Sequence, residues 1–541
     1  MVHGKLLVDR SRALWGRTHA RLGVEGWCAI LIVAGLASFF PHFPKIHSAN
    51  ERSRLFLAEA MVVDHTASID GAMKRWGGTP DKSRRDGRYY SDKAPGVAFA
   101  MVPALWVYVH VVDEPTLSGE MRLGRLVVST LPTLALLLGL IGLLREKIED
   151  RGLRLALLIA YGAGSLATTY SILLFGHQLS AVLVFGLFLV IRRADPNVAP
   201  PRAMVVGCLA AAAVIVEYQN ALFLVPLAIF YLVRVRGRLS AILFALAGMV
   251  PLTVALLVYH HVAFGSPLKT GYSFLVNQTF RSVHARGFLG IELPRLDHAF
   301  LSFLSPAKGL FFFSPFLLVG VAGLFILPRR SDAWVTGAMV VMYALFVSAM
   351  VFPGGGWTVS QRHLTPLVPW LLWPAGAAVV RWRWLRAPFI GLVVVSVLIT
   401  AISTVVWPYL FDALQNPFFQ LAWPLFRDEW LPPSVMSPLG VPSRLLFCAW
   451  LLLAFGALAR ALWSWYPASR TRALALVVGC LWIPLHLAAV SWIAAKQDVR
   501  QFRARVERDY VLDPSATPVY RVTKPSARAT SGATSTNERA P

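Results

Sequence analysis

Cysteine is scarce in this chain, which has four cysteines among its 541 residues. Cys28, Cys208, Cys448 and Cys480 all lie inside apolar segments, and none has a second cysteine or a histidine at metal-ligand spacing. This pattern excludes a disulfide framework and a zinc-finger fold. It predicts that the four thiols pack in the protein interior.

Charged residues are also scarce, and acidic residues are fewer than basic ones. Only 15% of the residues are charged, with 28 Asp and Glu against 52 Lys and Arg, so the net charge is +24. A soluble protein of this length needs far more charge to cover its surface. The basic residues form short clusters between apolar runs without a zinc-finger or helix-turn-helix signature, so nucleic acid is not an expected partner. Basic loops that fix membrane topology and contact anionic headgroups explain the excess.

Long apolar runs are what the sequence has in abundance. Hydrophobic residues make up 56% of the chain and the mean hydropathy is +0.58. About 13 segments are apolar enough to cross the ~30 Å hydrocarbon core of a membrane. We therefore predict an all-α fold, a polytopic membrane helix bundle of about 13 transmembrane helices, embedded in the lipid bilayer of the inner (plasma) membrane.

Charge and composition divide the chain into three parts. Residues 1–23 are basic and precede the first apolar run, which predicts a cytoplasmic arm. Residues 24–498 form the predicted transmembrane domain, and residues 499–541 are rich in Ser, Thr, Ala and Pro, which predicts a disordered tail. Residues 41–93 then form a long first extracytoplasmic loop. Within it, residues 53–70 have apolar side chains at helical spacing, which predicts a helix along the membrane surface.

The end of this loop, "DGRYYSDKAPG" at 86–96, is the densest polar stretch beside an apolar run. Lys93 and Arg88 lie near Tyr89 at a predicted helix entry, where cations and free backbone N–H groups suit a phosphate at headgroup depth. The alternative is interfacial anchoring, since Tyr, Lys and Arg gather at headgroup level in many membrane proteins. Asp92 is expected to line the same site.

A second polar stretch, "FPGGGWTVSQRH" at 352–363, lies between two apolar segments on the predicted outer side. Its glycines allow close backbone approach, and Arg362 can bind a phosphate in two-point fashion. Trp357 and His363 are expected to line the same cavity. The alternative is a flexible turn with an anchoring arginine.

Further polar residues interrupt apolar segments near the predicted outer face. Ionisable groups at such depth usually line a cavity or pair with one another. A single buried histidine is, however, more often a packing residue. The additional residues predicted to line the cavity are His177, Glu217, Tyr218, Lys269 and Tyr272.

Together these motifs resemble the GT-C superfamily of membrane glycosyltransferases, in particular the branch of protein O-mannosyltransferases and aminoarabinose lipid A transferases. That family has an acidic residue just after the first helix, matched here by Glu51, and an acidic-Lys-Pro element, matched by Asp92-Lys93-Ala94-Pro95. The later "GGGWTVSQRHLTPLVPW" is similar to the family's outward Gly-Trp and Arg-His-Leu element. Asn50 stands where the family usually has the first acid of an Asp-Glu pair, and the second proline is displaced.

The resemblance implies a GT-C-like fold and an inverting hexosyl- or pentosyltransferase. Such an enzyme moves a sugar from a polyprenyl-phosphate donor to an extracytoplasmic acceptor, which is a glycan, a lipid or a protein. Glu51 is the expected general base. Lys93, Arg88 and Arg362, with Tyr89, are expected to bind the donor phosphate. Some relatives use a divalent metal, for which Asp92 and His177 are the candidate ligands, but no cofactor is established by the motifs.

Two other classes of membrane protein compete with this interpretation. A transporter or flippase for lipid-linked sugars would have inverted repeats and charges near the membrane midplane, whereas the charges here cluster in outward loops and at helix ends. An O-antigen ligase or polymerase would centre on a large late outward loop. In this sequence the richest loop is the first.

Overall fold

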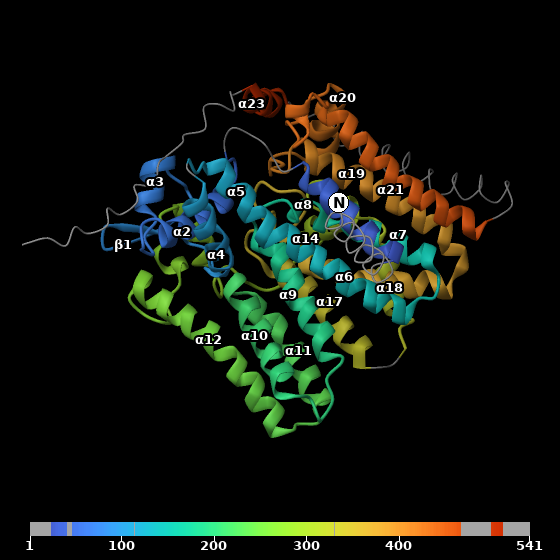
Figure 1. Cartoon of the computed structure of the whole chain (residues 1–541), viewed down its shortest axis with the longest axis horizontal. Helices are drawn as coiled ribbons and strands as arrows, with labels where there is room; N and C mark the ends of the chain where they lie inside the picture. The colour runs from blue at the N-terminus through green and yellow to red at the C-terminus, as the bar shows by residue number, and fades with distance from the viewer. Residues whose placement is uncertain (1–22, 40–45, 113, 329–330, 467–498, 512–541) are drawn as a thin grey trace, which may run out of the picture.

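Helices form nearly all of the regular structure in the computed structural model, which describes residues 23–39, 46–112, 114–328, 331–466 and 499–511 (Figure 1). Within these ranges, six helices are long and apolar enough to cross a membrane, and five shorter apolar helices of 10–17 residues accompany them. The all-α membrane helix bundle predicted from the sequence is confirmed. The number of crossings stays a prediction, because the cytoplasmic arm and the apolar residues after 466 lie outside the described ranges.

The first helix, Gly23–Ala37, leads into a loop region that contains two helices and a hairpin. These elements are α2 (Ala49–Val62), α3 (Asp70–Trp76), β1 (Ser83–Arg85) and β2 (Arg88–Tyr90). The Ser48 side chain accepts a hydrogen bond from the backbone N–H of Glu51 and caps the start of α2. The helix expected at residues 53–70 thus corresponds to α2, which begins and ends earlier in the chain than the prediction.

Helix α2 is buried within the protein along most of its length, and its predicted position along the membrane surface stays a prediction. Its charged residues Glu51, Arg54 and Glu59 are as inaccessible as its apolar ones. Apolar spacing marks one face of a helix, but it does not show whether partners of opposite charge cover the other face.

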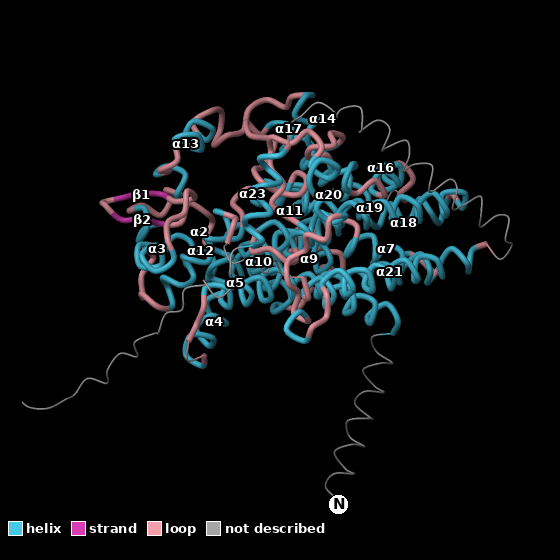
Figure 2. The backbone as a smooth tube through the Cα atoms, turned by 90° about the horizontal axis from the view of Figure 1, so that it is seen from above, coloured by secondary structure: helices cyan, strands magenta, loops and turns pink. Residues whose placement is uncertain are grey.

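The hairpin turns at Asp86 and Gly87, whose φ values are +48° and +78°. Two consecutive residues with positive φ form the turn that matches the twist of a two-residue hairpin, and Asp-Gly is a preferred pair there. Strand β1 also forms a bridge from Ser83 to Leu275, so the segment that follows α12 packs against the first loop. Figure 2 shows the hairpin at the edge of the molecule with α13 nearby.

Eight helical elements follow, and several are joined by short turns. They are α4 (Gly96–Val111), α5 (Leu117–Arg125), the π-helical η1 (Leu126–Thr130), α6 (Leu131–Lys147), α7 (Arg151–Ala163), α8 (Leu166–Tyr170), α9 (Gly176–Ile191) and α10 (Pro200–Val216). Elements α5, η1 and α6 are continuous from Leu117 to Lys147. Helix α4 has 16 residues and is one of the shorter apolar helices.

Helices α11 (Asn220–Arg234) and α12 (Leu239–Phe264) lie with α10 at one end of the molecule (Figure 1). Helices α10 and α12 cross at two glycines. A Cβ atom at Gly207 would lie 1.7 Å from the backbone oxygen of Ala245, and one at Gly248 would lie 2.0 Å from that of Met204. Small residues allow this close approach, as is common between membrane helices.

The second half of the described chain contains shorter elements between four long helices. They are η2 (Gly271–Phe274), α13 (Gln278–His284), α14 (Leu296–Phe303), α15 (Leu310–Phe313), α16 (Leu317–Leu324), α17 (Ser331–Ala349), η3 (Arg362–Leu367), α18 (Val368–Arg381), η4 (Arg383–Leu385), α19 (Arg386–Val406), η5 (Phe418–Ala422), α20 (Trp423–Arg427), η6 (Ser437–Leu439), α21 (Ser443–Trp465) and α23 (Arg500–Val511).

Helix α23 differs from the expectation of a disordered tail after residue 499. The Arg505 guanidinium lies 4.6 Å from the ring centroid of Trp357, and Arg503 forms an ion pair with Asp428. This first part of the tail is therefore helical and packed. Residues 512–541 lie outside the described ranges.

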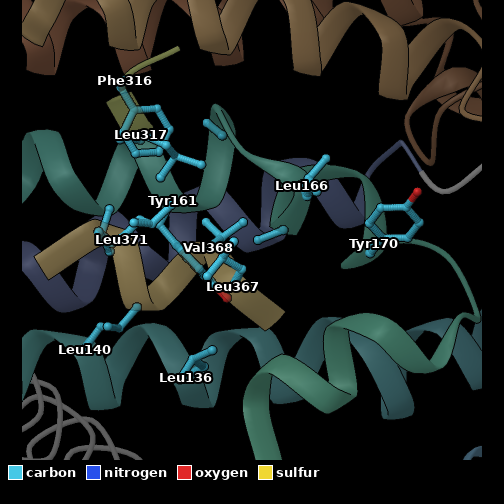
Figure 3. Packing of buried hydrophobic residues seen from close by; sticks show 14 of the residues in the cluster. Leu136, Leu140, Tyr161, Leu166, Tyr170, Phe316, Leu317, Leu367, Val368 and Leu371 are labelled. Carbon is cyan, nitrogen blue, oxygen red and sulfur yellow. The ribbon is translucent and has the colours of Figure 1, made fainter. Parts of the chain in front are cut away.

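The apolar core has two parts. The larger one joins α6, α7, α8, α9, α16, α18 and α19, and Figure 3 shows part of its packing around Tyr161, Leu317 and Leu371. The smaller one joins the first loop to α4 and to the end of α12. Three cysteines in the described ranges are free thiols, but Cys208 is exposed, so its predicted place in the interior is wrong. Cys480 lies outside the described ranges.

Candidate functional site

Lys93 lies between two carboxylates at the entry to α4. Its Nζ atom is 2.9 Å from Oδ2 of Asp81 and 3.2 Å from Oδ2 of Asp92. Burial by itself would lower the pKa of Lys93, but the two carboxylates raise it above its ordinary value. Burial raises the pKa of the Asp92 carboxyl, and the nearby Asp81 adds to this effect. Lys93 therefore stays protonated at neutral pH.

Hydroxyl groups connect this turn to α2. The Ser91 hydroxyl accepts from the backbone N–H of Lys93 at 3.2 Å and is 2.9 Å from the hydroxyl of Ser53. The side chains of Ser53, Ser91 and Asp92 are almost completely buried, whereas Lys93 is partly exposed. The Asp92-Lys93 element is thus held in a fixed position relative to α2.

Arg54 extends from α2 to the turn between α10 and α11. Its Nη2 donates to Oε1 of Glu217 at 2.6 Å, and its Nε donates to Asn50 at 2.9 Å. The third nitrogen, Nη1, is buried and has no hydrogen-bond partner in the described part of the chain. The hydrogen bond from Arg54 and the approach of His177 are both at Oε1 of Glu217, and Oε2 accepts no hydrogen bond from the described residues. This ion pair is therefore buried, and each partner still has an atom that makes no hydrogen bond to the described residues.

His177 begins α9 beside this ion pair. Its Nδ1 is 4.0 Å from Oε1 of Glu217, and its ring centroid is 4.8 Å from that of His363. The residue is 2% exposed, yet neither ring nitrogen has a hydrogen-bond partner among the described residues. Buried polar side-chain atoms are rarely left without a hydrogen-bond partner in proteins, so this histidine is a candidate to bind a ligand.

Arg362 and His363 come from the polar stretch at 352–363. Nδ1 of His363 is 3.0 Å from Oε1 of Gln361, and the side-chain amide of Gln361 donates to the backbone oxygen of Pro353. The guanidinium of Arg362 lies 5.5 Å from the ring centroid of Phe175, and its buried Nε has no partner in the described ranges.

Lys308 holds the same stretch in place. Its Nζ donates to the backbone oxygens of Gly356 at 2.7 Å and Thr358 at 3.0 Å, and it forms an ion pair with Asp412 at 2.7 Å. The predicted flexible turn is therefore anchored by a buried lysine.

The predicted site residues divide into two groups. The charges of Arg54, Lys93 and Arg362 all act on His177, and those of Asp92 and Glu217 act on Tyr272. We call these residues together with His363 the outward cluster; its eight members are Arg54, Asp92, Lys93, His177, Glu217, Tyr272, Arg362 and His363. Tyr218 adjoins it, with its ring centroid 6.0 Å from that of Tyr272.

Four predicted residues have no recorded contact with the outward cluster in the described part of the chain. Arg88 is exposed on the hairpin, and Tyr89 packs under Lys82 on the same hairpin. Lys269 is exposed near Phe274. Trp357 packs on Phe411 and Arg505 and is 42% exposed.

Glu51 lies one helical turn from Arg54, in a separate buried network. Its Oε1 accepts from Nε of Arg125 at 2.9 Å and from the backbone N–H of Leu174 at 2.7 Å. Its Oε2 accepts from the hydroxyl of Tyr409 at 2.7 Å and from Nη2 of Arg125 at 3.1 Å. Four donors therefore occupy the carboxylate of the predicted base, which is not accessible to solvent.

The described residues contain no group of three or more His, Cys, Asp or Glu side chains that could hold a metal ion. Asp92 and His177 are thus not joined by a third ligand there, and the structure gives the metal alternative no support.

Sequence reasoning missed two of the residues that organise the site. Arg125 was not singled out, although an arginine within a largely apolar helical region is a signal of a buried partner. Arg54 was not among the predicted site residues either. Its partner Glu217 is 163 positions away, so periodicity within α2 could not reveal it.

No protein-family model matches the chain, and no curated protein matches it. Among solved structures, the chain is similar to the crystal structure of ArnT from Cupriavidus metallidurans bound to undecaprenyl phosphate. The TM-score is 0.42 and the sequence identity is 14%, over 84% of this chain and 77% of that chain. At this level of similarity no residue role can be transferred, so the functional assignment depends on the residues of the site itself.

Proposed function

We propose that the chain is a membrane glycosyltransferase that transfers a sugar from a polyprenyl-phosphate donor to an extracytoplasmic acceptor. One observation carries the proposal. The outward cluster gathers three cations, Arg54 from within α2, Lys93 from the turn before α4 and Arg362 from the start of η3, and the charge pattern assigns these segments to the outer side. A phosphate on a lipid tail is the anion that a membrane protein meets at this depth.

Two unpaired nitrogens support a phosphate as the ligand. Nη1 of Arg54 and Nε of Arg362 are buried without a partner in the described ranges, and a buried guanidinium N–H without an acceptor is costly. Each of these nitrogens could donate to an oxygen of a phosphate that enters the cluster. Lys93 adds a further positive charge, although Asp81 and Asp92 already neutralise part of it. The roles of Arg88 and Tyr89 in phosphate binding stay predictions.

The reaction needs the same charges. When the acceptor attacks the sugar carbon from the face opposite the phosphate, the bond to the phosphate oxygen breaks and charge builds on the leaving group. Cations placed there beforehand stabilise that charge. The acceptor forms the new bond and loses its proton to a carboxylate. The configuration of the sugar carbon is thereby inverted.

Glu51 and Glu217 are the two candidates for that carboxylate. The family resemblance names Glu51, but a base needs a free lone pair that faces the acceptor, and four donors surround Glu51. Oε2 of Glu217 accepts no hydrogen bond from the described residues, and the Arg54 guanidinium binds only Oε1. We assign the proton transfer to Glu217. Glu51 then serves to fix α2 against the segments of Arg125 and Tyr409.

Mass spectrometry of glycolipids and glycans from a deletion strain tests the function. We expect one glycan or lipid to lose a sugar, with recovery on expression of the wild-type chain and not of Arg362→Ala. Native mass spectrometry of the purified protein should show binding of undecaprenyl phosphate. Unchanged glycans in the deletion strain, together with no binding of that lipid, would exclude the proposed function.

A further inference from the structure

A cavity of about 250 Å³ lies between α6, α9 and α10. It is at the end of α9 and the start of α10, where the basic stretch "RRADPNVAPPR" at 192–202 predicts the cytoplasmic side, whereas His177 of the outward cluster lies in the first turn of α9. The volume of the cavity is several times the ~30 Å³ that one water molecule occupies in the liquid. The cavity is therefore separate from the outward cluster and large enough for a phosphate group.

Three arginines line the cavity: Arg192, Arg193 and Arg202. Arg192 is fixed in place, because its guanidinium binds both carboxylate oxygens of Glu146 at 2.8 and 2.6 Å and lies 3.4 Å from Asp332. Arg193 and Arg202 have no ion-pair partner among the described residues. Their positive charges are thus available to an anion.

The remaining wall is apolar. Leu143, Leu189 and Val190 line it together with Gly139, which has no side chain. A soluble anion would gain nothing from such a wall. A phospholipid fits both parts, because its headgroup phosphate can bind guanidinium groups while its acyl chains lie along the leucines and the valine.

We propose that this cavity binds the headgroup phosphate of an anionic phospholipid from the cytoplasmic leaflet. Arg193 and Arg202 bind the phosphate, and Arg192, held by Glu146 and Asp332, forms the rigid side of the cavity. The site does not depend on the proposed glycosyl transfer, since it lies at the other end of α9 and uses none of the residues of the outward cluster.

Native mass spectrometry of the purified full-length protein tests the proposal, with phosphatidylglycerol, phosphatidylethanolamine and inorganic phosphate as separate probes. We expect the wild type to retain phosphatidylglycerol in preference to phosphatidylethanolamine. The double variant Arg193→Ala/Arg202→Ala should lose about tenfold in phosphatidylglycerol binding. The double variant Arg151→Ala/Arg236→Ala removes two exposed charges from predicted cytoplasmic turns and should bind as the wild type does.

Three outcomes would overturn the proposal. They are equal retention of the two lipids by the wild type, equal losses in the two double variants, and displacement of phosphatidylglycerol by inorganic phosphate, which would indicate a free-phosphate site. If the alanine variant does not fold, Arg193→Lys/Arg202→Lys replaces it. That variant keeps both charges, so it should retain the preference for phosphatidylglycerol with weaker binding.

Discussion

Nη2 of Arg54 lies 2.6 Å from Oε1 of Glu217, so a buried ion pair joins α2 in the first loop to the turn between α10 and α11. The side chains are only 2% and 9% exposed. Removing one partner from such a pair leaves the other charge buried and unpaired, which typically costs about 3–5 kcal/mol. The pair therefore places the first loop on the membrane bundle.

Replacing Glu217 with glutamine should lower turnover about a hundredfold, because the amide cannot accept the acceptor's proton. The measurement is recovery of the missing sugar in the deletion strain, at matched abundance of the protein in membranes. Glu292→Gln is a suitable control, since Glu292 pairs with Arg286 and has no recorded contact with a member of the outward cluster among the described residues. Near-normal activity of Glu217→Gln would return the proton transfer to Glu51.

The double variant Glu51→Gln/Arg125→Gln separates the two roles of Glu51. The single change Glu51→Gln leaves the Arg125 charge buried without its carboxylate, so we expect lower thermal stability and lower abundance. The double variant removes both charges, so it should recover part of the thermal stability and part of the abundance. If Glu51 serves only to hold the structure, activity should recover with abundance. Recovery of abundance without activity would identify Glu51 as the base.

Lys93→Ala should lower turnover by about tenfold to a thousandfold, the range for loss of one contact that stabilises developing charge. The substitution also leaves Asp81 and Asp92 as neighbouring buried carboxylates. Activity is therefore compared with that of Lys93→Ala/Asp81→Asn, which restores the charge balance. Lys82→Ala is a control in the same loop. An active Lys93→Ala protein at normal abundance would remove Lys93 from the site.

His177→Phe should weaken substrate binding, because the ring nitrogens without partners are expected to bind a polar group of the ligand. Phenylalanine keeps a ring against His363 but removes both nitrogens. We expect an increase in KM of about tenfold with an unchanged thermal midpoint. If His177 only packs, KM will not change, and the thermal midpoint of the variant will equal or exceed that of the wild type.

Labelling with an impermeant maleimide tests the topology. Lys74 is exposed on α3 in the first loop, and Arg151 is exposed at the start of α7. In a background with the native cysteines replaced by alanine, Lys74→Cys should react in intact cells whose outer envelope has been permeabilised. Arg151→Cys should react only after lysis. The reverse pattern would contradict the predicted outward position of residues 41–93 and the proposed function with it.

The helical membrane bundle could be predicted from the sequence, because the length and apolarity of a transmembrane segment are local properties. The position of the polar stretches near Lys93 and Arg362 could also be predicted, since each interrupts or adjoins an apolar run. The hairpin turn at Asp86 and Gly87 is likewise local, because it depends on the positive φ values of two adjacent residues.

Only the tertiary structure decided which of these polar groups meet. Glu51 is 74 positions from Arg125 and 358 positions from Tyr409, and no spacing along the chain encodes contacts over such separations. The same holds for Arg54 and Glu217. A charged side chain on the polar face of a helix has the same sequence signature whether water or a distant partner covers it. Long-range packing therefore buried α2, surrounded Glu51 with donors and left one oxygen of Glu217 without a donor among the described residues.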